Sequence, residues 1–197
     1  VSTSRGGPRG AKRDHHPTHR DDVAGVVVTE ANGVLVIGGG QAGLAMGYFL
    51  AQRRRQFVIV DAGAEIGEAW RRRWDSLRLF TPGQYDSLAG MPFPAPRDTY
   101  PGKDAVAEYL QSYATHFELP VRLGMKVTSL TRSEGVYVVK GGGEVLEARQ
   151  VVVATGPREA SRLAGVPRVA TNGLTTWWFA VDEAPDPRRL VAVDARG

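Results

Sequence analysis

The sequence predicts an α/β fold in which a parallel sheet is extended by a small antiparallel meander. Short continuous apolar runs occur at Val34–Ile37, Phe57–Val60 and Val151–Ala154, as is typical of parallel strands buried on both faces. Between residues 126 and 148, apolar and polar residues alternate instead. Such alternation is typical of antiparallel strands with one exposed face.

The first apolar run begins a βαβ unit. It ends in Gly38-Gly39-Gly40, which indicates a tight turn, and residues 41–53 then follow a helical pattern. The second run reads as a buried strand that ends at Asp61. Strand, helix and strand within about thirty residues form a βαβ unit, whose crossover should be right-handed.

The rest of the chain supplies the other elements. We expect a short helix at 65–73, an irregular ordered loop at 76–101, an amphipathic helix at 103–117 and a third parallel strand at 119–123. The meander should comprise residues 126–131, 137–140 and 145–148. The last apolar run, which we expect to be fully buried, then returns to the parallel sheet.

The two ends of the chain differ from this central part. Residues 1–32 are rich in Gly, Pro, Arg, His and Asp, so we expect a disordered leader. His15, His16 and His19 in it are interpreted as solvated residues, and no metal site is expected. Residues 158–197, including 175–179 and 185–189, show no period that fits a helix or strand and are predicted to be an atypical tail.

Composition excludes several classes of function. The net charge is +4, but no basic stripe with interleaved aromatic residues occurs, so no nucleic-acid partner is expected. The chain has no cysteine, which removes disulfides, thiolate metal sites and dithiol chemistry. No apolar run reaches membrane-spanning length. We therefore expect a cytoplasmic protein without a membrane partner.

The glycine turn has the spacing of a phosphate-binding loop. Gly38 permits the sharp turn, Gly40 lets the backbone approach a diphosphate, and Gly43 lets the helix pack close to the strand. The helix that begins at Gln41 and Ala42 directs its free N–H groups and positive dipole end at the anion. The turn follows a strand, opens a helix and precedes an acid-terminated strand, and this context indicates dinucleotide binding.

The residues after the second and last strands indicate which dinucleotide binds. Asp61, followed by Ala62, should accept hydrogen bonds from ribose hydroxyls, which suits FAD or NAD rather than NADP. The alternative is an aspartate that only caps the next turn. An NAD domain would continue with alternating strands and helices, whereas here a loop and a meander follow. Together with the Ala154, Thr155 and Gly156 turn, this favours FAD.

Residues 34–157 resemble the N-terminal, FAD-binding half of flavin-containing monooxygenases, including bacterial flavoprotein monooxygenases and plant indole-pyruvate monooxygenases. The resemblance lies in VLVIGGGQAGLAMGYFL, FVIVDAGAEIGEAWRRRWDSLRLFTP, MPFPAPRDTYPGKDAVAEYLQSYA and VVVATGP. It implies a Rossmann-like FAD-binding domain over residues 33–157. It also implies further FAD contacts. Gly67, Trp70 and Arg71 should lie along the diphosphate and ribityl chain. Leu79 and Thr81 should lie along the isoalloxazine ring, and Val127 should contact the adenine. The alternative for Trp70 is that it shares a buried helix face with Trp74.

The resemblance implies an FAD-dependent oxidoreductase of the monooxygenase type. In such enzymes NADPH reduces the flavin, and a flavin C4a-hydroperoxide oxygenates a small-molecule substrate. The flavin performs this chemistry, so no catalytic residue is assigned, and the substrate and oligomeric state stay open. Two other functions also stay open: a different FAD oxidoreductase with two dinucleotide domains, and a non-catalytic FAD-binding module.

The sequence departs from the family after residue 157. The family has a second glycine fingerprint, which binds NADPH, and a histidine-containing linker motif between its two domains. Neither is present here, because no second fingerprint occurs and no histidine follows His116. The simplest hypothesis is a truncated or frame-shifted gene product. Because the NADPH site is missing from these residues, we expect weak FAD retention and little or no NADPH-dependent oxygenation by this chain alone.

Overall fold

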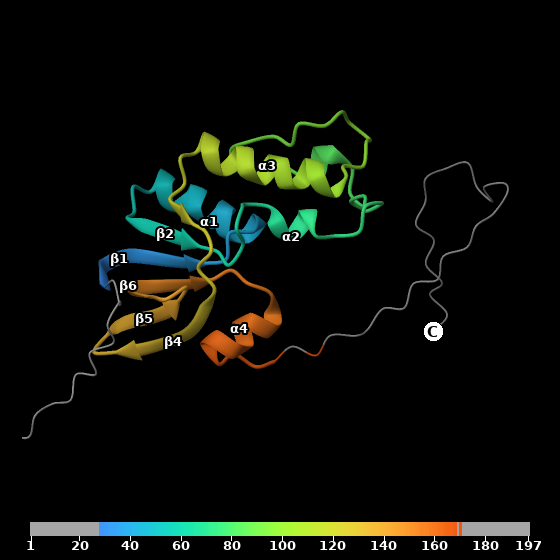
Figure 1. The fold of residues 1–197 in the computed structure, drawn as a ribbon. Coiled ribbons are helices and arrows are strands. Elements are labelled where there is room, and N and C mark those ends of the chain that lie inside the picture. Colours follow the sequence, from blue (N-terminus) through green and yellow to red (C-terminus); the bar gives the residue numbers. More distant parts are fainter. Residues whose placement is uncertain (1–27, 169, 171–197) are drawn as a thin grey trace, which may run out of the picture.

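The computed structural model describes residues 28–168 and residue 170 (Figure 1). Six strands form one sheet in the order β3-β2-β1-β6-β5-β4. The strands are β1 Val28–Ile37, β2 Phe57–Val60, β3 Val121–Arg122, β4 Val127–Ser133, β5 Val136–Gly141 and β6 Glu144–Val153. The helices are α1 Gln41–Gln52, α2 Glu68–Arg71, α3 Lys103–His116 and α4 Pro157–Ala164, with a short 3₁₀ helix η1 at Gly83–Tyr85.

The sheet confirms the predicted fold class. Strands β3, β2, β1 and β6 pair in parallel, while β6, β5 and β4 pair antiparallel. In the centre, Val36 of β1 lies between Ile59 of β2 and Val152 of β6. The parallel strands thus all end at the same edge of the sheet, where the loops that follow them meet.

The sheet separates two apolar cores. In Figure 1, α1 and α3 lie above the sheet and α4 lies below it. Val34 and Val36 of β1 pack on the α1–α3 side, whereas Leu35 and Ile37 pack on the side of Leu163 in α4. Successive side chains of a strand point to opposite faces, and a central strand covered on both faces is therefore apolar throughout.

Two tyrosines of α3 hold part of the long loop between α2 and α3. The Tyr109 hydroxyl accepts a hydrogen bond from the N–H of Leu88 (2.7 Å) and donates one to the carbonyl oxygen of Met91 (2.7 Å). The Tyr113 hydroxyl donates to the carbonyl oxygen of Ala89 (2.7 Å). Burial is the main cause that raises the pKa of Tyr113, to about 12. The loop is irregular and ordered, as predicted, because buried hydroxyls of the helix bind its backbone.

The predicted strands Val145–Ala148 and Val151–Ala154 are a single strand, β6, and the prediction of two strands was wrong. The polar pair Arg149-Gln150 interrupts the apolar pattern, but β1 pairs with β6 on both sides of it. The residues of the second apolar run are half-buried rather than fully buried. Strand β1 also begins at Val28, inside the segment expected to be a disordered leader. Pairing between β1 and β6 sets where β1 begins and how far β6 extends, and local sequence patterns do not encode such long-range pairing.

The predicted tail contains a helix that the sequence patterns did not reveal. Helix α4 begins at Pro157 and ends at Ala164, and Gly165 directly after it has a φ of +64°, as is common at helix ends. Its one buried side chain is Leu163, so the apolar signal is weak. Residues 175–179 and 185–189, and the three leader histidines, lie outside the described residues. Predicted helix 65–73 is also shorter in the structure, since Gly67 adopts a φ of +85° before α2.

Within the part of the chain that the structure describes, no helix combines the length and apolar character needed to span a membrane. The same residues contain no group of three histidine, cysteine, aspartate or glutamate side chains that could hold a metal ion.

Candidate functional site

The turn between β1 and α1 requires glycine for steric reasons. Gly38 has a φ of +111°, and its N–H donates to the carbonyl oxygen of Val60 (2.8 Å). A Cβ atom at Gly38 would lie 2.5 Å from the carbonyl oxygen of Ala154. At Gly43 a Cβ atom would overlap the carbonyl oxygen of Gly38. These two glycines bring the strand, the helix and the turn after β6 into close contact, as their spacing predicts.

Gly40 differs from the other two glycines of the motif. A Cβ atom at Gly40 would have no other atom within 4 Å, and Gly40, Gln41 and Ala42 are exposed. No side chain caps the start of α1, and its first turn contains no acidic residue. The first N–H groups of a helix need acceptors and carry its positive dipole end. The open space therefore fits an anionic group such as a diphosphate.

Asp61 lies at the end of β2 beside this turn. Its Oδ2 accepts a hydrogen bond from the N–H of Gly39 (2.6 Å), and its Oδ1 accepts one from the N–H of Gly63 (2.7 Å). The carboxylate thus both caps the next turn and binds the glycine turn. Each carboxylate oxygen retains further acceptor capacity, so the half-buried Asp61 can still accept hydrogen bonds from two hydroxyls of a ligand.

A depression of about 380 Å³ opens next to Asp61. Its lining combines small side chains with one ion pair, and consists of Asp61, Ala62, Gly63, Ala64, Glu68, Ala69 and Arg72. The lining from Glu68 to Arg72 comes from α2 and the residue after it. Residues of α2 and Asp61 line the same depression, so α2 lies beside the carboxyl end of β2. The sequence patterns did not predict this arrangement.

Gly67 and Trp70 fasten α2 to the rest of the domain. A Cβ atom at Gly67 would lie 2.8 Å from the Cα and carbonyl oxygen of Ala107 in α3, so α2 begins in close contact with the α3 backbone. Trp70 is half-buried against the first core. Trp74 lies beyond the end of α2 and is 54% exposed. The alternative in which Trp70 and Trp74 share one buried helix face is therefore wrong.

Arg71 points toward α3 rather than into the depression. Its Nε lies 3.0 Å from Oε1 of Glu65, and its Nη1 lies 4.0 Å from Oδ1 of Asp104. Arg72 is the arginine that lines the depression. The resemblance selected Arg71, whose assignment stays a prediction. Three consecutive arginines carry no local signal of which one lines the depression.

Leu79 and Thr81 follow on the segment after α2. Leu79 is half-buried against the first core, and its N–H donates to the carbonyl oxygen of Pro101 (2.9 Å). The Thr81 hydroxyl donates to Oδ1 of Asp86, while Oδ2 of Asp86 is buried without a hydrogen-bond partner among the described residues. Phe80 between them is 82% exposed. This segment therefore carries both an exposed aromatic ring and an oriented hydroxyl.

The remaining predicted site residues lie directly after β6 and at the start of β4. The Ala154 N–H donates to the carbonyl oxygen of Ile37 (2.8 Å), and Thr155 and Gly156 follow directly, so this turn adjoins the glycine turn. Val127 is buried at the start of β4, and its carbonyl oxygen accepts a hydrogen bond from Nη2 of Arg162 (2.8 Å). The structure brings Ala154 next to Gly38 but shows no such contact for Val127.

Comparisons with known proteins agree with this geometry. A family model described as pyridine nucleotide-disulphide oxidoreductase matches residues 35–175. An uncharacterized CzcO-like oxidoreductase from Geobacillus kaustophilus is 48% identical over 63% of this chain and 36% of its own length. Indole-3-pyruvate monooxygenase YUCCA1 from Oryza sativa is 34% identical over 68% of this chain and 34% of its own. A flavin-containing monooxygenase structure from Stenotrophomonas maltophilia superposes with a TM-score of 0.62 and 39% identity, covering 65% of this chain and 39% of that one. The chain thus spans less than half the length of each of these proteins.

Proposed function

Because the chain belongs to the pyridine nucleotide-disulphide oxidoreductase family, we propose that it is the FAD-binding part of a flavin-dependent monooxygenase. The similarity to a flavin-containing monooxygenase and to an indole-3-pyruvate monooxygenase supports this choice within the family. The absence of cysteine from these 197 residues means that they cannot contribute a dithiol.

The observation that carries the proposal is the open start of α1 next to the carboxylate of Asp61. The exposed N–H groups of Gly40, Gln41 and Ala42 would bind the diphosphate. Asp61, held by the N–H groups of Gly39 and Gly63, would accept hydrogen bonds from the ribose hydroxyls. A diphosphate next to a ribose is what FAD presents and FMN lacks.

The other predicted site residues take supporting roles in this proposal. Bound FAD would supply the redox chemistry, while the chain positions it and limits access of water. Gly67 and Trp70 would set the wall near the diphosphate, Leu79 and Thr81 would lie along the isoalloxazine ring, and the Ala154–Gly156 turn would close the other side. The assignments of Arg71 to the diphosphate and of Val127 to the adenine stay predictions.

The activity of the whole protein is a further part of the proposal. The matched relatives are more than twice as long as the region they share with this chain. We assign reduction by NADPH and oxygenation of a small-molecule substrate to the complete protein. Cytoplasmic location stays a prediction from the sequence.

Calorimetric titration of the purified chain with FAD, ADP and FMN tests the proposal. We expect FAD to bind, ADP to compete with it, and FMN to bind far more weakly because it has no adenosine diphosphate. The Asp61→Asn variant should weaken FAD and ADP binding, whereas Glu108→Gln, a matched change at an exposed residue of α3, should not. If FAD does not bind, or if FMN binds as tightly as FAD, the proposal fails.

A further inference from the structure

We propose that Arg72 forms a flat platform on which the adenine of the dinucleotide stacks. This inference rests on the proposed function, because it takes the ribose to lie at Asp61. Arg72 and Asp61 line the same depression of about 380 Å³. A base attached to a ribose at Asp61 lies within reach of the same depression.

The guanidinium of Arg72 is held in place by Glu68. Nη2 of Arg72 pairs with Oε1 of Glu68, and Oε2 of Glu68 accepts a hydrogen bond from the N–H of Ala64 (2.6 Å). The side chain of Glu68 is only 18% exposed, whereas that of Arg72 is 77% exposed. The ion pair thus fixes one edge of the guanidinium and leaves most of the group open to a ligand.

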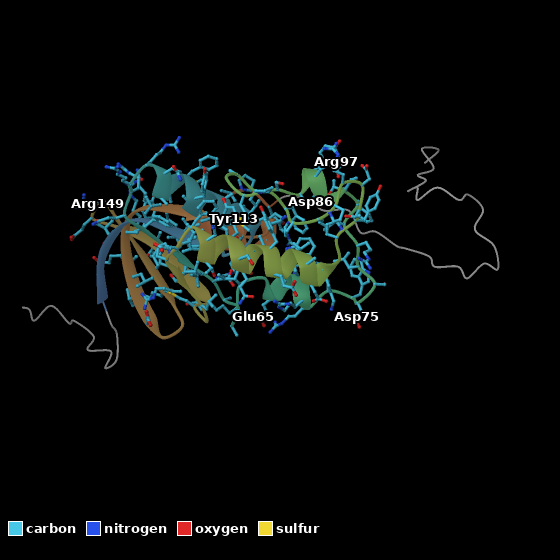
Figure 2. The ribbon with its side chains drawn as sticks, turned by 90° about the horizontal axis from the view of Figure 1, so that it is seen from above. Glu65, Asp75, Asp86, Arg97, Tyr113 and Arg149 are labelled. Carbon is cyan, nitrogen blue, oxygen red and sulfur yellow. The ribbon has the colours of Figure 1, made fainter. Side chains whose placement is uncertain are left out.

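The backbone that carries Arg72 is fixed from both sides by one lysine. Nζ of Lys103 donates to the carbonyl oxygens of Arg71 (3.0 Å) and Arg73 (3.1 Å). Its third hydrogen bond goes to Oδ1 of Asp75 (2.8 Å), and the side chain of Lys103 is only 12% exposed. In Figure 2, Glu65 and Asp75 lie along the same side of α3. Lys103 also caps the carboxyl end of α2, where a cation is favourable.

The chemistry of the pair favours a base over a phosphate. Glu68 offsets the charge of Arg72, so the guanidinium attracts an anion less than a free arginine would. Its planar faces remain available, and guanidinium planes stack well on aromatic rings. The other lining residues include Ala62, Ala64 and Ala69, whose small side chains leave room for a flat ring.

The neighbouring arginines do not share these features. Arg71 is held by Glu65 and Asp104 on the side of α3. Arg73 is exposed and does not line the depression. Of the three consecutive arginines, only Arg72 combines a fixed backbone, a fixed guanidinium and a position beside Asp61.

Titration of the full chain with ADP and UDP tests this inference, because the two share ribose and diphosphate and differ in the base. Arg72→Ala and Arg72→Lys should each weaken ADP binding by about 5- to 150-fold and reduce the preference for ADP over UDP. Lys103→Met should also weaken ADP binding and reduce the preference for ADP over UDP. Arg73→Ala should leave the ADP affinity and the preference for ADP over UDP as in the unchanged chain. Thermal melts should show that all variants fold.

The outcomes separate this inference from the proposed function. If the unchanged chain does not bind FAD or ADP, the proposed function fails and this inference with it. If it binds ADP but Arg72→Lys retains full affinity, charge rather than a flat face is what matters, and the platform is refuted. Equal losses in Arg72→Ala and Arg73→Ala would also refute it, as would an unchanged ratio of ADP to UDP affinity in both Arg72 variants.

Discussion

Replacing Gly40 with alanine should weaken FAD binding while leaving the fold intact. Gly40 has φ −82° and ψ −170°, an extended conformation that any residue adopts, and a Cβ atom there meets no other protein atom within 4 Å. The new methyl group would instead occupy the space where we place the diphosphate. Loss of one hydrogen bond to a charged group costs about 1.5–3 kcal/mol, which corresponds to an increase in Kd of about 10- to 150-fold.

Gly102 provides a matched control for this substitution. It is also the N-cap of a helix, α3, with φ −83° and ψ 169°, and the nearest atom to an added Cβ would be Nη1 of Arg78 at 3.5 Å. Replacing either glycine with alanine should therefore cost a similar free energy of unfolding, about 0.5–1 kcal/mol. Only the Gly40 variant should lose affinity for FAD.

The assay combines calorimetric titration with FAD and thermal unfolding of both variants. If Gly40→Ala binds FAD as tightly as the unchanged chain, no diphosphate approaches the start of α1. Equal losses of affinity in Gly40→Ala and Gly102→Ala would mean that the effect comes from general destabilisation of helix ends. Either result would refute the reasoning.

Three further predictions concern stability. Gly43→Ala should destabilise the chain by more than about 3 kcal/mol, because its Cβ would overlap the carbonyl oxygen of Gly38; a chemical unfolding midpoint equal to that of Gly40→Ala would contradict this. Leu146→Ala should cost about 2–5 kcal/mol, since Leu146 is fully buried in the second core, and urea unfolding measures it. Tyr113→Phe should cost about 1 kcal/mol at pH 7, because it leaves the carbonyl oxygen of Ala89 without its hydrogen bond. Burial raises the pKa of Tyr113 from 10.0 to about 12 in the folded chain, so the stability from the neutral tyrosine is complete below pH 10 and is lost as the pH rises toward 12. The difference in unfolding free energy between the two chains should therefore shrink over that range, and a constant difference would argue against the assignment.

The glycine turn and Asp61 could be predicted from the sequence because their requirements are local. Gly38 needs a positive φ and Gly43 needs close packing, and both follow from a strand, a tight turn and a helix in succession. Asp61 is identified by its position at the end of the next strand. The same logic predicted α3, whose apolar face repeats every three to four residues.

Other features could not be predicted because they depend on contacts between distant residues. Strand β6 continues through Arg149-Gln150 because β1 pairs along its length, and no local pattern shows that pairing. Arg162 binds the carbonyl oxygens of Val127 and Thr128, but nothing near it in the sequence indicates this. Lys103 lies within a segment that resembles the family, yet its role as a cap for α2 appears only once α2 and α3 are placed together.

Backbone amide NMR of the chain during titration with FAD, and separately with FMN, tests the central claim most directly. The N–H groups of Gly39, Gly40, Gln41, Ala42 and Gly63 should shift with FAD and not with FMN, because they surround the proposed diphosphate and the Asp61 carboxylate. The residues around Arg149, which Figure 2 shows at the opposite end of the molecule from Asp75, should not shift. Saturable FAD binding that moves those distant signals and leaves the glycine turn unchanged would contradict the account.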